Sequence, residues 1–288
     1  MIDHDQIRKT VSDFYTRAVK TGSGCCGPGS SGCCGSGATD VLPKGFAAQF
    51  AGYGEDTTGL PADAVHNSFG CGNPLAFCDV KPGEVVLDLG SGAGIDLLVA
   101  ARKVGPTGHV IGVDMTDEMI ERARANAVAA GFTNIEVRQG IIEALPIEAE
   151  SVDWVISNCV INLSPEKNRV FREIARVLKP GGRIRVSDIV VQDIPDWVRQ
   201  SMSLYASCVS GAVSEQEYAD GLRQAGLVDV EVTERFPYDQ DQIRAMIESE
   251  IPDDVRMGAD GARLAAEVAG KVCSAKFQAT KPHHTPNT

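Results

Sequence analysis

Three cysteines carry the chemistry that this sequence most clearly offers. Cys159 directly follows a predicted buried strand at 152–157, and a Gly-rich turn lies upstream at 88–94. Cys71 and Cys208 could complete a pocket of three thiolates around it. Thiolates are soft ligands that select thiophilic ions. Each cysteine also has a purely structural interpretation, because free cysteine is among the most buried residue types.

The local sequence separates the cysteines from one another. Cys71 lies between two glycines, which predicts an accessible thiol on a loop. Cys208 ends a predicted helical stretch, where a buried cysteine would be ordinary. Cys78 and Cys273 lie in sequences that predict packing, so we expect both to be structural.

Four further cysteines lie in a Gly- and Ser-rich segment at 22–37, namely Cys25, Cys26, Cys33 and Cys34. This segment has almost no apolar side chains to bury, which predicts a flexible arm. The cysteines lack the C-x-x-C spacing of a structural zinc site, and no histidine is near. One interpretation is a linker that happens to carry thiols. We favour the other, a mobile redox relay or an arm that captures soft metal ions.

Composition limits the class of protein. The 288 residues are 43% hydrophobic, enough for one large core and a smaller appendage. A net charge of -12 argues against binding to nucleic acid, whose phosphates require clustered Lys and Arg. The N-terminus has no signal pattern, and no apolar run reaches membrane-spanning length. We therefore predict a cytoplasmic protein with no membrane association, whose cysteines rest mainly as thiols.

Strands and helices alternate along the middle of the chain, which predicts a parallel sheet with helices on both faces. The predicted strands are 84–89, 109–113, 135–138, 152–157, 183–188, 227–236 and an antiparallel 272–279; the predicted helices include 95–104, one from Thr116 to Gly131, and 166–178.

We expect three regions. Residues 1–80 carry an N-terminal helix, the cysteine-rich arm and a substrate-side segment, and residues 81–235 form the cofactor-binding domain. Residues 236–288 hold a mostly helical insertion, the last strand and a tail.

Ligands of such sheets bind beyond the carboxyl ends of the strands. Glycines of the turn at 88–94 allow a close approach of the backbone to a ligand, and Asp114 could accept hydrogen bonds from ribose hydroxyls. The pair Leu145-Pro146, preceded by Glu143, would flank an adenine. A dinucleotide fingerprint would need Gly or Ala where Ile95 stands, so an NAD site is disfavoured. The turn also lacks the Lys-Ser/Thr pair of a P-loop.

Several linked motifs point to one family. With the Gly-rich turn and the Lys-Pro-Gly-Gly segment at 179–182, residues 80–235 resemble the class I S-adenosylmethionine-dependent methyltransferases. Three more segments, Phe-Gly-Cys-Gly-Asn-Pro at 69–74, Asp-Met-Thr-Asp-Glu-Met at 114–119 and Ser-Asn-Cys-Val-Ile-Asn-Leu at 157–163, narrow the match. The chain is similar, nearly end to end, to the bacterial-type arsenite methyltransferases.

The resemblance implies a Rossmann-like α/β fold, S-adenosylmethionine as cofactor, a glutathione- or thioredoxin-type thiol reductant, and arsenite and methylarsenite as substrates. It also implies that Cys71, Cys159 and Cys208 bind trivalent arsenic. The implied cofactor site comprises Asp88, Gly90, Ser91, Gly92, Gly94, Asp114, Met115, Ile141, Ile142, Glu143 and Asn158. Ile141 departs from the acidic residue common in small-molecule methyltransferases, so adenine recognition would rely on backbone groups and Glu143.

The chemistry agrees with this expectation. Trivalent arsenic is thiophilic and three-coordinate, and its lone pair can attack the sulfonium methyl group without a general base. Catalysis would then come mainly from positioning. Two alternatives stay open: a methyltransferase of an organic small molecule with structural cysteines, and a thiol protein that only sequesters metalloids.

Overall fold

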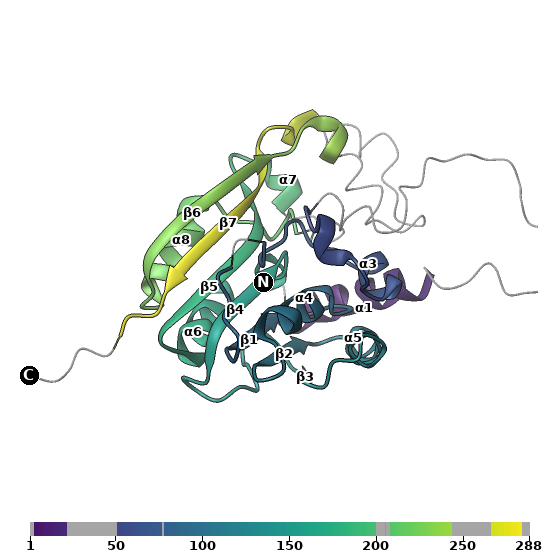
Figure 1. Ribbon diagram of the computed structural model, residues 1–288. Coiled ribbons are helices and arrows are strands. Elements are labelled where there is room, and N and C mark those ends of the chain that lie inside the picture. The colour runs from purple at the N-terminus through teal and green to yellow at the C-terminus, as the bar shows by residue number, and fades with distance from the viewer. Residues whose placement is uncertain are drawn as a thin grey trace, which may run out of the picture.

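The sheet expected from the sequence is present. The computed structural model of the chain describes residues 3–21, 51–76, 78–199, 205, 208–243 and 266–283. Seven strands form one sheet in the order β3-β2-β1-β4-β5-β7-β6 (Figure 1). Five are parallel, and β7 runs antiparallel between β5 and β6. Their bounds are Val85–Leu89 for β1, His109–Asp114 for β2, Ile135–Gln139 for β3, Val152–Asn158 for β4, Leu178–Val191 for β5, Val228–Pro237 for β6 and Val272–Thr280 for β7.

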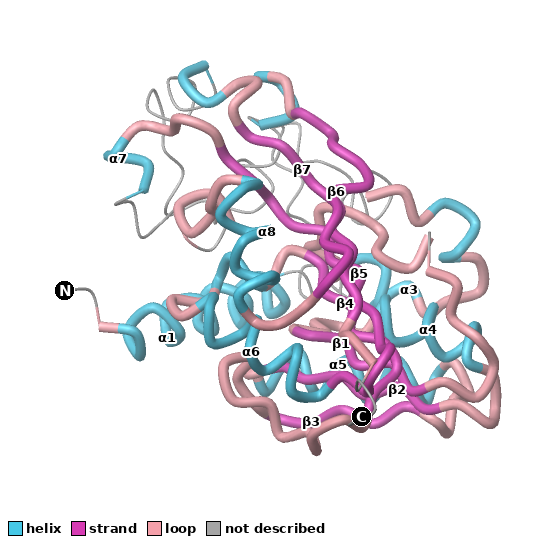
Figure 2. The backbone as a smooth tube through the Cα atoms, turned by 90° about the vertical axis from the view of Figure 1, so that its left-hand side faces the viewer, coloured by secondary structure: helices cyan, strands magenta, loops and turns pink. Residues whose placement is uncertain are grey.

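Helices cover both faces of this sheet because its central strands are apolar on both sides. On one face, Leu87 and Leu89 pack with α6 (Lys167–Val177) and α8 (Glu215–Gln224). On the other, Val86 packs with α4 (Ile95–Val104) and α5 (Asp117–Ala129). Figure 2 shows α6 and α8 on one side of the sheet, with α3 (Ala62–His66) and α4 on the other. The carboxyl ends of β1, β2 and β4 thus form one edge above a rigid core.

The N-terminal helix α1 (His4–Thr21) packs on α5, and its apolar residues Ile7, Val11 and Val19 are buried. A short 3-10 helix η1 (Gly54–Thr57) and α3 follow it among the described residues. Two shorter elements are α7 (Asp196–Arg199) and η2 (Ile161–Leu163). Ser214 and Glu217 form a capping box at the start of α8.

Some local predictions need correction. Thr116 occupies the N-cap of α5 without any side-chain cap bond; instead its backbone N–H donates to Asp114 Oδ1 at 2.9 Å. Strand β5 begins five residues earlier than predicted, because Leu178 already pairs with Val152 across a register shift. Most of the predicted helical insertion, 244–265, lies outside the described residues. Within the described ranges, every helix is too short or too polar to cross a membrane.

Candidate functional site

A cavity opens beyond the carboxyl ends of β1, β2 and β4, where the parallel sheet predicted a ligand. Every predicted cofactor residue lines it except Asp88 and Gly94. Further lining comes from α1, through Arg8, Val11 and Tyr15, from residues 67–70 and 158–164, and from the neighbours of the predicted residues, Ala93, Ile95, Asp96, Val113, Thr116, Met119 and Gly140. Helix α1 therefore forms one wall of the cavity, a role that its sequence pattern did not reveal.

The Gly-rich turn has the geometry of a ligand cradle. Gly90, Gly92 and Gly94 have φ values of 67°, 51° and 94°, a region that side chains with a Cβ rarely adopt. Around Gly92, the place of a missing Cβ has no protein atom within 4 Å. The Ser91 Oγ beside it is buried and has no hydrogen-bond partner. Open space next to an unsatisfied hydroxyl fits a polar ligand lying against the backbone.

Asp114 ends β2 and holds the turn in place. Its Oδ2 accepts from the Gly92 N–H at 2.9 Å, while Oδ1 accepts from Thr116. Burial raises its pKa, and the backbone hydrogen bonds oppose that effect. Each carboxylate oxygen has a further lone pair, so hydrogen bonds from ribose hydroxyls remain feasible. Asp88 instead lies buried at the end of β1, where burial and the neighbouring Asp96 raise its pKa strongly.

A network that the sequence did not predict connects Asp96, Tyr53 and Asn158. Tyr53 Oη donates to Asp96 Oδ2 at 2.8 Å, and Asn158 Nδ2 donates to Tyr53 Oη at 2.8 Å. Burial raises the pKa of Asp96 to about 6 and that of Tyr53 far above its usual value. The sequence showed only that Asp96 is an acidic residue in the first turn of α4. An acidic residue at that position is already favoured by the helix dipole, so it did not indicate a network.

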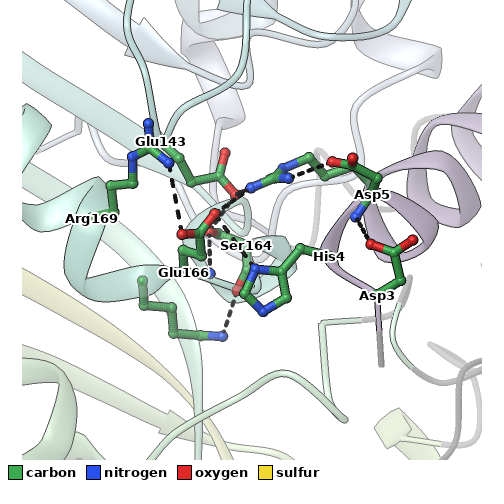
Figure 3. A network of polar contacts seen from close by, with 9 residues as sticks. Asp3, His4, Asp5, Glu143, Ser164, Glu166 and Arg169 are labelled. Carbon is green, nitrogen blue, oxygen red and sulfur yellow. Dashed lines mark hydrogen bonds and ion pairs between the residues drawn. The ribbon is translucent and has the colours of Figure 1, made fainter. Parts of the chain in front are cut away.

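Glu143 is also more engaged than expected. Its Oε1 accepts from Ser164 Oγ at 2.7 Å and from the Arg8 guanidinium at 3.3 Å, and its side chain is 3% exposed. Arg8 also pairs with Glu166 at 2.6 Å. Figure 3 shows this network spanning α1 and the loop before α6. Glu143 therefore anchors α1 over the cavity, in addition to any contact with a ligand.

The three predicted ligand cysteines lie together, and one of them, Cys159, lines the cavity. Cys71 and Cys159 form a disulfide with their Cα atoms 5.8 Å apart. Cys208 Sγ donates to the Cys159 carbonyl oxygen at 2.9 Å. All three belong to one packed cluster, and Cys159 itself lines the cavity.

Two expectations about these cysteines were wrong. Cys71 and Cys159 are not both thiols here, because their proximity allows the disulfide. Cys208 lies in a turn with φ of 63°, not in a helix, and Cys159 also has a positive φ, 59°. In this disulfide form, the described part of the chain arranges no group of three or more His, Cys, Asp or Glu to hold a metal ion. A three-thiolate site therefore requires reduction of the disulfide.

The loop that carries Cys71 is fixed to the sheet by its neighbours. Asn158 Oδ1 accepts from the Gly72 N–H at 3.2 Å, and Asn158 Nδ2 donates to the Gly72 carbonyl. Ser274 Oγ on β7 donates to the Cys71 carbonyl at 3.1 Å. A Cβ on Gly72 would lie 2.0 Å from Ser187 Oγ, so only glycine permits this approach.

The other cysteines divide in two groups. Cys78 is 8% exposed in the core beside α4, as its sequence predicted, and Cys273 is half-buried on β7. Cys25, Cys26, Cys33 and Cys34 lie outside the described residues.

The chain is similar to known methyltransferases. Residues 80–226 match the family model described as a methyltransferase domain. The chain is 43% identical to the arsenite methyltransferase of Halobacterium salinarum over 232 residues, 80% of this chain and 59% of that protein. It is 34% identical to the arsenite methyltransferase of Mus musculus over 75% of this chain and 57% of that one. The chain thus spans a little over half the length of these curated relatives.

A solved structure is similar to this chain in both fold and sequence. The crystal structure of CrArsM, an arsenic(III) S-adenosylmethionine methyltransferase from Chlamydomonas reinhardtii, superposes with a TM-score of 0.63 at 33% identity. The match covers 81% of this chain and 73% of that chain.

Proposed function

Because this chain belongs to the arsenite methyltransferase family of class I methyltransferases, we propose that it transfers methyl groups from S-adenosylmethionine to trivalent arsenic. Cys71, Cys159 and Cys208 hold arsenite, and afterwards methylarsenite, as thiolate ligands. One observation carries this proposal: three cysteines from distant parts of the chain converge where the cavity beside the Gly-rich turn ends. The proposal extends to the reducing cytoplasm as its setting, where the cysteines can be thiols.

Arsenic enters by ligand exchange. A thiol reductant of the glutathione or thioredoxin type first supplies two electrons and two protons to the Cys71–Cys159 disulfide. Arsenous acid then exchanges its three hydroxyl groups for three thiolates, releasing three waters as the thiol protons combine with the departing hydroxides. The lone pair of arsenic remains free, because the cysteines occupy only its three bonding positions.

Methyl transfer then depends on alignment. S-adenosylmethionine supplies an electrophilic methyl group when it is bound. Residues of the chain hold the arsenic lone pair in line with it, Cys159 from the cavity wall and Cys71 from the loop gripped by Asn158. Positioning of this kind replaces acid–base catalysis, which fits a cavity in which the carboxylates of Asp114 and Glu143 are engaged in structural hydrogen bonds.

Methyl transfer oxidises arsenic by two electrons, which must be returned before the product is trivalent. The methylated arsenic is pentavalent; it returns to the trivalent state when an incoming thiolate attacks one ligand sulfur and a disulfide forms. A Cys71–Cys159 disulfide is one form of that oxidised product, so each turnover requires the external thiol reductant. Cys25, Cys26, Cys33 and Cys34 are proposed as a relay for these electrons.

The test separates arsenic species after reaction. Reduced protein is incubated with S-adenosylmethionine, arsenite and a dithiol, and methylated arsenicals are quantified by chromatography. We expect methylated products from the wild type and none from Cys159→Ser, Cys71→Ser or Cys208→Ser, with cofactor affinity within about twofold of wild type. Cys273→Ser is the matched control and should retain full activity.

Other outcomes would favour other functions. Full activity in Cys159→Ser would contradict the thiolate site and favour an organic methyl acceptor. Stoichiometric binding of arsenite without any methylated product would favour a sequestering protein.

A further inference from the structure

Asp96 lines the cofactor cavity and has one carboxylate oxygen without a hydrogen-bond partner. Its Oδ2 accepts from Tyr53, whereas Oδ1 is buried and has no hydrogen-bond partner. The residue is 5% exposed and lines the cavity next to the Gly-rich turn. A buried anionic oxygen without a partner is unfavourable, so it indicates a missing donor, and a cation satisfies it best.

The hydrogen bonds that begin at Asp96 have a fixed direction. Tyr53 carries a single hydroxyl proton and donates it to Asp96, so Tyr53 Oη must accept from Asn158 Nδ2. This determines the orientation of the Asn158 amide and turns its Oδ1 toward the Gly72 N–H. Asn158 Nδ2 also donates to the Gly72 carbonyl, and it lies 3.4 Å from Asp96 Oδ2, a longer direct contact between the two side chains. One amide thus binds both polar backbone groups of the residue next to Cys71.

We propose that Asp96 binds the α-ammonium of the methionine moiety of the cofactor, and that Tyr53 and Asn158 transmit its occupancy to the Cys71 loop. Cofactor and arsenic then bind cooperatively. The inference rests on the proposed function and adds a coupling between its two sites. The physical basis is a loss of conformational freedom that is paid on cofactor binding. An ammonium on Oδ1 fixes the Asp96 carboxylate, and its hydrogen bonds then fix Tyr53 and Asn158. The Cys71 loop is therefore already in position when arsenic binds. By linkage, arsenite must strengthen cofactor binding by the same factor.

The first experiment identifies what Asp96 recognises. S-adenosylhomocysteine has the ammonium but no sulfonium charge, and methylthioadenosine has neither. Calorimetry of reduced Asp96→Asn should show affinity for S-adenosylhomocysteine reduced by at least about 30-fold, as expected for a lost buried charge partner. Affinity for methylthioadenosine should stay within about twofold of wild type, because the asparagine still accepts from Tyr53. Equal losses for both ligands, or no loss for either, would overturn the role of Asp96.

The second experiment measures the coupling. Arsenite affinity of the reduced protein is determined by equilibrium dialysis with and without saturating S-adenosylhomocysteine. We expect about tenfold tighter arsenite binding with the ligand in the wild type, and a clearly smaller factor in Tyr53→Phe, where only the 3.4 Å contact between Asn158 Nδ2 and Asp96 Oδ2 still connects the two sites. Tyr218→Phe is the matched control, since Tyr218 is also a fully buried tyrosine bonded to an aspartate, Asp188, and it should retain the wild-type factor.

The outcomes are separable. A Tyr53→Phe protein that binds both ligands with an unchanged coupling factor overturns the relay while leaving the proposed function intact. If Tyr53→Phe does not fold, Asn158→Asp serves instead, because a carboxylate cannot donate to Tyr53. Absence of arsenite binding in every protein would overturn the proposed function and the coupling together, and the comparison of the two adenosine ligands would still decide the role of Asp96.

Discussion

An alanine at Gly72 would push the Cys71 loop away from the sheet. The added Cβ would lie 2.0 Å from Ser187 Oγ and 2.9 Å from Ser187 Cβ, whereas ordinary contacts begin at 3.4 Å. If Ser187 keeps its position, the loop must retreat by about 1.4 Å, and if its hydroxyl rotates away, by about 0.5 Å. Ser187 is fully buried, so the strand itself has little freedom to move.

The magnitude follows from this displacement. A misplacement of about 1 Å in a reacting group can lower a rate by about 100-fold, so we expect a loss of that order in arsenic methylation by Gly72→Ala. Overpacking should also cost about 1–3 kcal/mol of folding free energy. Affinity for S-adenosylhomocysteine should change less than affinity for arsenite, because the clash lies on the side of the Cys71 loop.

Graded rescue makes the test specific. Ser187→Ala in the Gly72→Ala background removes the 2.0 Å contact and leaves the 2.9 Å contact, whereas Ser187→Gly removes both. Single-turnover methylation should therefore recover partly in the first double variant and further in the second, with each single Ser187 variant as a control. A wild-type rate in Gly72→Ala, or equal impairment in both double variants, would refute the steric argument.

Four other predictions concern Arg8, Asp96 and the cysteine-rich arm. Arg8→Met should lower the free energy of unfolding by about 1–3 kcal/mol and weaken cofactor binding, because Glu143 loses its cationic partner. Chemical denaturation measures the change in stability. Lys9→Met is the control, because Lys9 forms an exposed ion pair on the same helix. Affinity for S-adenosylmethionine should rise as the pH increases through about 6, where Asp96 ionises to bind a cation, and calorimetry of Asp96→Asn should show a flatter profile. The raised pKa has the opposite sign for stability: the contribution of Asp96 to the stability of the ligand-free protein should be greatest below the usual pKa of Asp and be lost as the pH rises through about 6, as the difference in thermal melting between the wild type and Asp96→Asn can show. Deletion of 22–37 should slow multiple turnovers but not the first turnover, and unchanged multiple turnover with a dithiol would exclude an obligatory relay.

The central sheet could be predicted because its signals are local. Apolar strands, helix boundaries and the glycines at the end of β1 each depend on a few adjacent residues, and the structure confirms them. The same holds for the position of Asp114 at the edge of the sheet.

The contacts that shape the cavity were not predictable in this way. Arg8 and Glu143 are 135 residues apart, and Tyr53 and Asp96 are 43 apart, so neither pair leaves a periodic or adjacent pattern. Cys208 was predicted to be helical because its neighbours favour helix, whereas tertiary packing places it in a turn. The disulfide depends on the distance between two loops, which no spacing in the sequence encodes.

The left-handed backbone at Cys159 and Cys208 lowers the stability of the protein at two positions that the proposed activity requires. For a residue with a Cβ this conformation costs about 1–2 kcal/mol, and glycine would adopt it with little strain. Under reducing conditions, where the Cys71–Cys159 disulfide is absent, random mutagenesis selected only for heat resistance should therefore favour Cys159→Gly and Cys208→Gly, replacing the proposed ligands with a more stable and inactive protein. A thermostable catalyst has to be engineered elsewhere in the chain, and its screen must score arsenic turnover together with melting temperature.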